Sequence, residues 1–358
     1  MKLWLALVAA LLLSGCSTVG YYWQSVSGHM QMLNAARPVA DLLVDPQTPA
    51  ALKVRLELSQ RIRRFAATDL KLPDNASYTR YADLRRSAVV WNVVAAPEFS
   101  LTLKTWCFPV AGCVGYRGYF NELEARLMAE QLKAEGLEVS VYGVPAYSTL
   151  GKLDWLGNLG ADPLLNTFIA YPEGELARLI FHELAHQVVY AADDTLFNES
   201  FATAVERLGS QRWLTTQASQ AAKDEYAALD ARRQQFRGLT AATRRDLTLI
   251  YASNTALVRQ NRAQAAPKII AFQKFRTDYE KLKKSWGDPP PRTSGYDAWV
   301  AQANNASFGA QAAYDDLVPG FEALFEREGK DWQRFYDAVR QLAELPKTER
   351  HLALKVKN

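Results

Sequence analysis

Apolar residues recur with two different periods along this chain, and the two periods predict different structures. Between about residues 31 and 72 they return at helical intervals, with interruptions at Pro46 and Pro49. Residues 87–106 are instead rich in Val and Trp, and apolar residues alternate with polar ones towards the end of this segment. We therefore expect helices first and then two β-strands.

The next segments predict a helix and further strands. Residues 121–136 are amphipathic and are bounded by Asn121, a good N-cap, and Gly136, a typical helix stop. Short apolar runs at 139–142 and 164–170 then predict two more strands. The central part of the chain is thus expected to form a small mixed sheet.

From Glu173 to the end, the pattern is almost entirely helical. Residues 204–290 contain long, highly charged helical segments, which predict a projecting helical arm. Residues 291–358 complete the body with C-terminal helices. The predicted fold class is therefore α+β and predominantly helical.

The N-terminal residues resemble a lipoprotein signal. Lys2 precedes Leu3 to Leu13, eleven residues without a polar side chain, which suits a signal peptide and is too short to cross a bilayer. Leu13-Ser14-Gly15-Cys16 then matches the bacterial lipobox. The resemblance implies that Cys16 becomes the lipid-modified N-terminus, and Ser17 after it favours the outer membrane of a Gram-negative cell.

These features divide the chain into a signal peptide, a tether and a body. The expected units are a signal peptide over 1–15, a lipidated tether over 16–30, and a body over 31–358 in which residues 31–203 hold the first helices and the small sheet. An ordinary secretory signal with a chance cysteine is the alternative.

Charge and cysteine content narrow the class of protein. The 358 residues include 42 basic and 38 acidic side chains without a basic stripe, which argues against a nucleic-acid partner. Cys107 and Cys113 are close together with Pro and Gly between them, so an oxidising compartment predicts a disulfide loop. Two buried reduced thiols are the alternative.

The segment from Arg178 to Tyr190 contains the sequence His182-Glu183-Leu-Ala-His186. Two histidines four positions apart lie on the same face of a helix, where both can bind one metal ion. Glu183 lies beside such an ion and can take a proton from a water bound to it. The chain has only four histidines, so the occurrence of two in one pentapeptide favours a metal site.

A third ligand is expected shortly after this helix. Asn198-Glu199-Ser-Phe-Ala resembles the segment of gluzincins in which the glutamate binds zinc, although the linker before it is shorter than in the best-known gluzincin aminopeptidases. Asp193 and Asp194 are competing ligands. Glu206 is two helical turns beyond Glu199 and is a candidate partner that orients a histidine, or else an ordinary surface residue.

Together with Cys107–Phe120 and Tyr147–Gly151, these motifs resemble the "Putative aminopeptidase" family of bacterial zinc lipoproteins. The resemblance spans most of the mature chain and implies a zincin-like core with one zinc ion. Related gluzincins stabilise the oxyanion with a downstream tyrosine, for which Tyr251, Tyr296 and Tyr314 are eligible and Tyr314 is favoured.

The sequence therefore predicts a zinc metallopeptidase of the envelope that acts on peptides or proteins, with aminopeptidase activity as the favoured subtype. An endopeptidase in outer-membrane protein quality control would use the same chemistry. The alternative from another class is a non-catalytic zinc-binding lipoprotein whose helical arm binds or chaperones an envelope partner.

Overall fold

The computed structural model describes residues 2–108, 112–150, 160–252, 265–287, 294–312 and 316–355. The side chains of residues 2–18 and 294 are outside this description. The expected lipidation site, Cys16, and the favoured tyrosine, Tyr314, therefore lie outside the described side chains.

Within the described residues the chain is mainly helical with small sheets, which confirms the predicted α+β class at this level. The helices are α1 (Lys2–Ala35), α2 (Val39–Val44), α3 (Ala50–Thr68), α4 (Glu122–Ala134), α5 (Glu173–Val188), α6 (Thr195–Thr216), α7 (Gln220–Ala252), α9 (Ala265–Ser285), α10 (Ser294–Gln302), α11 (Asn305–Ala312), α12 (Val318–Arg327), α13 (Trp332–Glu344) and α14 (Lys347–Ala353). The strands are β1 (Arg37–Pro38), β2 (Arg80–Ala82), β3 (Val90–Pro97), β4 (Trp106–Phe108), β5 (Gly112–Val114), β6 (Arg117–Tyr119), β7 (Leu137–Val144) and β8 (Leu164–Leu165).

The largest pairing is the antiparallel ladder of β3 and β7, in a sheet of order β6-β3-β7. Its register runs from Val90 opposite Val144 to Pro97 opposite Leu137. Strand β3 is buried along almost its whole length, which explains its near-continuous apolar sequence. A second sheet has the order β1-β2-β8, and β4 pairs with β5 in a hairpin.

Two of the predicted strands are corrected. Residues 101–105 form no strand, and the strand expected there is reduced to β4. The apolar run 164–170 pairs only through Leu164 and Leu165, after which the chain turns. The side chains of Phe168 and Ile169 are buried from that turn, so burial rather than strand pairing explains the apolar run.

The amphipathic helix predicted for 121–136 is confirmed as α4. The Asn121 side chain accepts hydrogen bonds from the backbone N–H groups of Leu123 and Glu124. Gly136 follows the helix with a φ of +83°, a left-handed conformation that glycine adopts at little cost.

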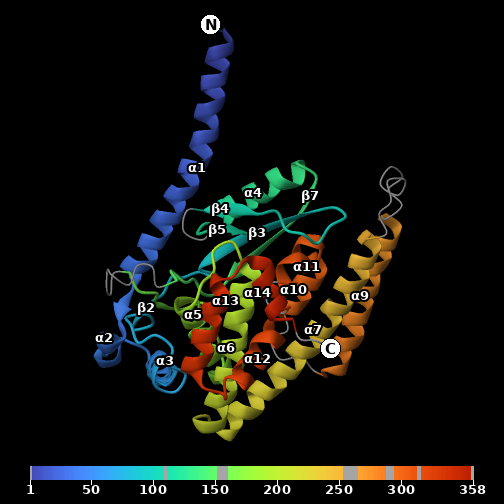
Figure 1. The fold of residues 1–358 in the computed structure, drawn as a ribbon. Coiled ribbons are helices and arrows are strands. Elements are labelled where there is room, and N and C mark those ends of the chain that lie inside the picture. Colours follow the sequence, from blue (N-terminus) through green and yellow to red (C-terminus); the bar gives the residue numbers. More distant parts are fainter. Residues whose placement is uncertain are drawn as a thin grey trace.

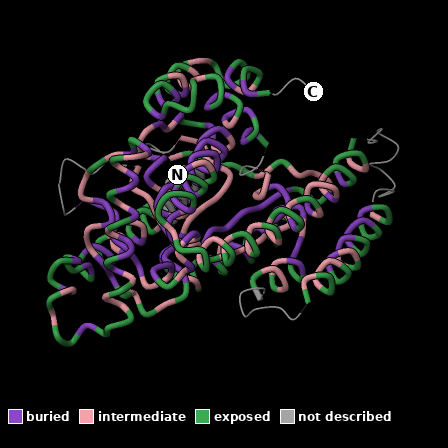
Figure 2. Tube along the Cα trace, turned by 90° about the horizontal axis from the view of Figure 1, so that it is seen from below, coloured by how far each residue is buried: buried purple, intermediate pink, exposed green. Residues whose placement is uncertain are grey.

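The helical core positions the site described below. Helices α5 and α6 pack together, and α3 and α12 lie against them. Figure 2 shows buried segments gathered in the interior, with exposed residues along the outer helices. The core includes fully buried aromatic side chains, among them Phe181, Phe197, Phe201, Phe321 and Phe335.

A hairpin of α7 and α9 lies at one side of this core (Figure 1). The helix before it, α6, remains part of the core to its end, because Trp213 near its last turn is 1% exposed. The inner face of the hairpin packs with α10 and α11 around a separate aromatic cluster that includes Phe236, Phe275 and Phe308.

The expected tether over 16–30 belongs to a single long helix, α1, which projects from the body towards the N-terminus (Figure 1). Its C-terminal part contacts the body, where Gln24 accepts a hydrogen bond from the backbone N–H of Phe120. In the described part of the chain, no helix combines the length and the apolar character needed to cross a membrane.

Candidate metal centre and active site

Helix α5 carries His182 and His186 one turn apart. Its other positions hold the helix in the core, because Leu176, Ile180 and Leu184 are almost completely buried. The helix therefore cannot rotate without exposing these side chains, and the orientation of the two imidazoles is fixed by packing. His186 is itself buried, and only 12% of the His182 side chain is exposed.

The turn between α5 and α6 places Glu199 beside these histidines. The side-chain amide of Asn198 closes this turn with two hydrogen bonds to the backbone of Ala191. Its oxygen accepts from the Ala191 N–H and its nitrogen donates to the Ala191 carbonyl, each at 2.8 Å. Asp194 caps α6 by accepting from the N–H of Phe197. The short linker thus folds back tightly enough to bring the next residue, Glu199, over α5.

The three side chains present their ligand atoms to one point. The Nε2 atoms of His182 and His186 are 3.2 Å apart, and a Glu199 oxygen lies 3.3 Å from the first and 3.7 Å from the second. Ligand atoms about 2.0–2.1 Å from a tetrahedral zinc are about 3.3 Å apart. The group therefore has a size compatible with one metal ion.

The electrostatics of the group also suit a cation. Burial lowers the pKa of His186 to about 4, so its imidazole is neutral. Burial by itself would also lower the pKa of His182. Hydrogen bonds and charge interactions with Glu199 and Glu206 outweigh this effect and raise the pKa of His182 to about 10. Without a metal, a proton on His182 supplies the positive charge that the two carboxylates require, and a bound cation would supply the same charge.

Glu206 connects His182 to a buried ion-pair network. One carboxylate oxygen is 3.0 Å from Nδ1 of His182, and the other accepts a hydrogen bond from Nε of Arg178 at 2.8 Å. Burial by itself would raise the pKa of Glu206, but Arg178 and His182 lower it to about 2. Glu206 is therefore ionised and fixes the orientation of the His182 ring.

The network continues away from the site towards the helical hairpin. Glu175, one turn before Arg178 on α5, pairs with both Arg178 and Arg233. Arg233 lies on α7, so the hairpin is tied to the helix that carries the histidines.

Glu183 is half-buried next to the candidate metal ligands. Burial is the main cause that raises its pKa, to about 7, against the lowering effect of His182. A carboxylate with a pKa near neutrality can both accept and return a proton, as a general base requires.

Tyr78 is a residue near Glu183 that the sequence pattern did not single out. It is 1% exposed, its hydroxyl has no hydrogen-bond partner in the described part of the structure, and its backbone has a φ of +63°. Such a conformation is uncommon for a bulky residue and costs about 1–3 kcal/mol. Burial raises the pKa of Tyr78 well above its usual value, and Glu183 and Asp162 act in the same direction.

The negative charge of Glu199 acts on three further tyrosines, Tyr116, Tyr142 and Tyr190. Burial is the main cause that raises the pKa of each, and the negative charge of Glu199 adds to it. They come from separate parts of the chain, and only Tyr116 and Tyr190 lie in segments that the motifs had marked. Nothing in the local pattern distinguishes them from ordinary packing residues.

The eligible downstream tyrosines that the structure describes lie elsewhere. Tyr251 donates a hydrogen bond to Asn305 at 2.7 Å, and Tyr296 packs against Phe236 in the aromatic cluster of the hairpin. Tyr314, the favoured one, is outside the described residues and stays a prediction.

The competing acidic ligands have other contacts. The Asp194 carboxylate lies 2.9 Å from Nε2 of His351, and Asp193 accepts a hydrogen bond from the backbone N–H of Cys113 at 2.5 Å. Cys113 in turn forms a disulfide with Cys107 across the β4–β5 hairpin. Neither aspartate belongs to the group formed by the histidines and Glu199.

The chain was compared with known protein families, curated proteins and solved structures. A family model described as "Putative aminopeptidase" matches residues 20–354. No curated protein and no solved structure matches the chain significantly.

Proposed function

The chain belongs to the "Putative aminopeptidase" family, and on this premise we propose that it is a zinc-dependent peptidase of the bacterial envelope, with aminopeptidase activity. The observation that carries the proposal is the convergence of His182, His186 and Glu199 on one point, with Glu183 beside it. Two imidazoles and one carboxylate form a donor set that suits catalytic zinc, because a fourth position stays open for water or substrate.

When bound, zinc would act as a Lewis acid towards water and the scissile carbonyl. The chain's own residues supply the remaining chemistry. Glu183 accepts a proton at its carboxylate and returns it to the leaving amine, and its raised pKa suits both steps. Glu206 and Arg178 hold the His182 ring in place during these steps.

Strand β7 offers an edge along which an extended peptide can pair. Its partner β3 occupies one side, and β7 pairs with no other strand in the described residues. The carbonyl of Val144 accepts a hydrogen bond from the N–H of Val89 and so points towards β3. Because the main-chain groups of successive residues in a strand point to opposite sides, those of Val141 and Gly143 point away from β3, to the open edge. The negative charge of Glu199 acts on Tyr142 between them, which supports a position of this edge near the candidate metal centre.

We extend the proposal to location. The apolar run Leu3 to Leu13 and the lipobox ending at Cys16 support lipid attachment, most favourably at the outer membrane of a Gram-negative cell facing the periplasm. A disulfide between Cys107 and Cys113 is consistent with an oxidising compartment.

The function is tested by metal analysis and a mixed peptide library, with the full chain in detergent. We expect about one zinc ion per chain. Hydrolysis should stop when a chelator removes the metal and return when zinc is added. Stepwise release of N-terminal residues would identify an aminopeptidase, whereas cleavage of N-terminally blocked peptides would identify an endopeptidase. If the zinc-loaded protein cleaves nothing, the peptidase proposal is wrong and a partner-binding lipoprotein is favoured.

We expect the variant Tyr78→Phe to lower kcat by about tenfold or more, because the hydroxyl is free to donate a hydrogen bond to Glu183 or to substrate during the reaction. Among the described residues this hydroxyl has no hydrogen-bond partner, so its removal should not lower the free energy of unfolding. Tyr81→Phe, in the same segment, is the matched control. An unchanged kcat in Tyr78→Phe would exclude a role in the reaction.

A further inference from the structure

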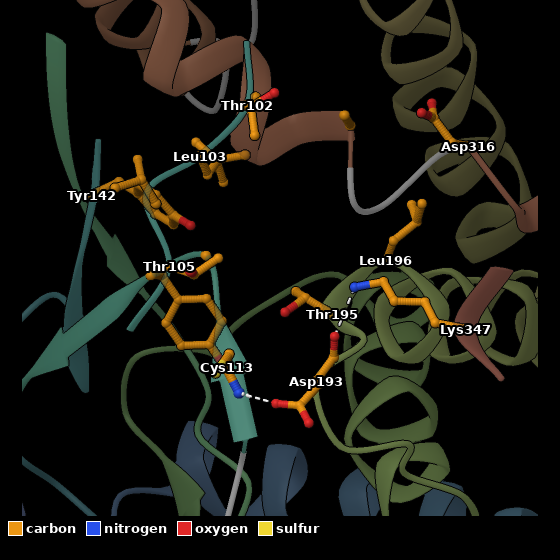
Figure 3. Close-up of a pocket in the computed structure, with 16 residues that line it drawn as sticks. Thr102, Leu103, Thr105, Cys113, Tyr142, Asp193, Thr195, Leu196, Asp316 and Lys347 are labelled. Carbon is orange, nitrogen blue, oxygen red and sulfur yellow. Dashed lines mark hydrogen bonds between the residues drawn. The ribbon is translucent and has the colours of Figure 1, made fainter. Parts of the chain in front are cut away.

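A cavity of about 350 Å³ lies between the sheet, the loop 102–105, α11 and the start of α6, the helix that carries Glu199 (Figure 3). Pockets that bind small molecules or side chains begin at about this volume. None of the three candidate metal ligands lines this cavity. Whether the cavity adjoins the site therefore depends on the structural elements that the cavity and the site share.

The first shared element is α6. Thr195 and Leu196 line the cavity, four and three residues before Glu199. Residues at these spacings lie on one helical face, and helical side chains lean towards the N-terminal turn. The Glu199 side chain therefore leans towards the turn that forms one wall of the cavity.

The second shared element is a pair of tyrosines. Tyr116 and Tyr142 line the cavity, and the negative charge of Glu199 acts on both of their hydroxyl groups. These two tyrosines of the cavity wall are therefore close enough to the candidate metal centre for the charge of Glu199 to affect them. A substrate bound along the β7 edge would bring a side chain to this wall.

The lining is mainly apolar. Val94 is 1% exposed, and Leu103, Leu196 and Ala310 complete the apolar surface around the two tyrosines. Gly309 allows α11 to approach this closely, because a Cβ atom there would lie 2.5 Å from the carbonyl oxygen of Leu101. A mainly apolar, partly open cavity of this size favours an aliphatic or aromatic group over a charged one.

Charged groups are confined to one side of the cavity, where they are already paired. Asp193 accepts from the backbone N–H of Cys113, and Lys347 donates to the backbone carbonyl of Asp193 at 2.7 Å (Figure 3). Asp316 pairs with Arg244 of α7. These contacts join the disulfide hairpin, the α5–α6 turn and α14, and so fix the wall of the cavity in place.

We propose that this cavity receives a large apolar side chain of the peptide substrate, such as that of Leu, Met or Phe, next to the bond that is cleaved. The inference rests on the proposed peptidase function and adds a substrate class to it. Ala310 is then a specificity-determining residue, because a larger side chain there would occupy the space.

The test compares Ala310→Phe with Gln311→Phe in the full chain in detergent. The substitution Gln311→Phe adds the same side chain to the same helix, at a position that does not line the cavity. The readout is kcat/KM for peptides that differ only in one residue flanking the cleaved bond, as Gly, Ala, Leu or Phe. We expect the wild type and Gln311→Phe to prefer Leu and Phe by about tenfold or more, and Ala310→Phe to lose this preference.

A binding measurement separates failure of the cavity from failure of the function. Saturation-transfer NMR with L-phenylalaninamide, on zinc-loaded protein in the Glu183→Gln background, should detect contact with the Gln311→Phe protein and much less with the Ala310→Phe protein. Hydrolysis without a preference, or equal loss for all peptides in Ala310→Phe, overturns the cavity assignment. Absence of hydrolysis combined with the expected binding difference overturns the peptidase function and leaves the cavity assignment standing.

Discussion

Replacing Glu183 by Gln is expected to lower kcat/KM by about 10²- to 10⁴-fold while zinc binding is kept. The amide has nearly the same shape as the carboxylate but cannot accept a proton from water. Glu183 lies beside the candidate ligands and is not one of them, so the metal content should not change. Peptide hydrolysis and metal analysis on the same preparation measure both quantities.

The matched control is Glu122→Gln, the same substitution in the first turn of α4, where the side chain is 42% exposed and pairs with Arg126 of the same helix. It should retain wild-type activity. If Glu183→Gln keeps more than about a tenth of the activity, another group takes the proton and the role given to Glu183 is wrong. If it loses zinc as well, the loss of activity does not report on proton transfer, and the metal-saturated variant must be assayed.

The second large effect is expected for Arg178→Leu, which should lower the free energy of unfolding by about 3–5 kcal/mol. Glu206 and Arg178 are both largely buried, and their side chains are 6% and 19% exposed. Removal of the guanidinium leaves a buried carboxylate without its main partner. Because Glu206 also orients His182, zinc affinity should fall by about 10- to 100-fold.

Urea denaturation and zinc titration measure these two effects. The double variant Arg178→Leu/Glu206→Leu removes both charges, so it should be more stable than Arg178→Leu alone although its zinc affinity stays low. A loss of less than about 1 kcal/mol in Arg178→Leu would mean that the pair behaves like an exposed one and that the network does not hold the site.

The sequence by itself determined the features that depend on near neighbours along one helix or turn. His182 and His186 share a helical face because they are four residues apart, whatever the rest of the fold. The cap at Asn121 and the stop at Gly136 are set by the local backbone, and α4 (Glu122–Ala134) lies between them in the structure. The general class, mainly helical with small sheets, follows from periodicity over long segments in the same way.

The tertiary structure decided which distant side chains surround those histidines. Arg178 is part of the motif segment, but only the packing of α5 against α6 shows that it holds Glu206. Tyr78, Tyr116 and Tyr142 have no local signal, since an aromatic residue in a core looks the same in sequence whether or not it faces a carboxylate.

The difference between the strand expected at 164–170 and the turn observed there also arises because a local pattern does not show tertiary packing. Its apolar residues are needed for burial, and burial can be reached from a turn as well as from a strand, so the pattern could not distinguish them. The cavity is lined by segments that are far apart in the sequence, from Val94 to Lys347. Local periodicity determines which face of each element is apolar, whereas the space between elements depends on how those faces pack.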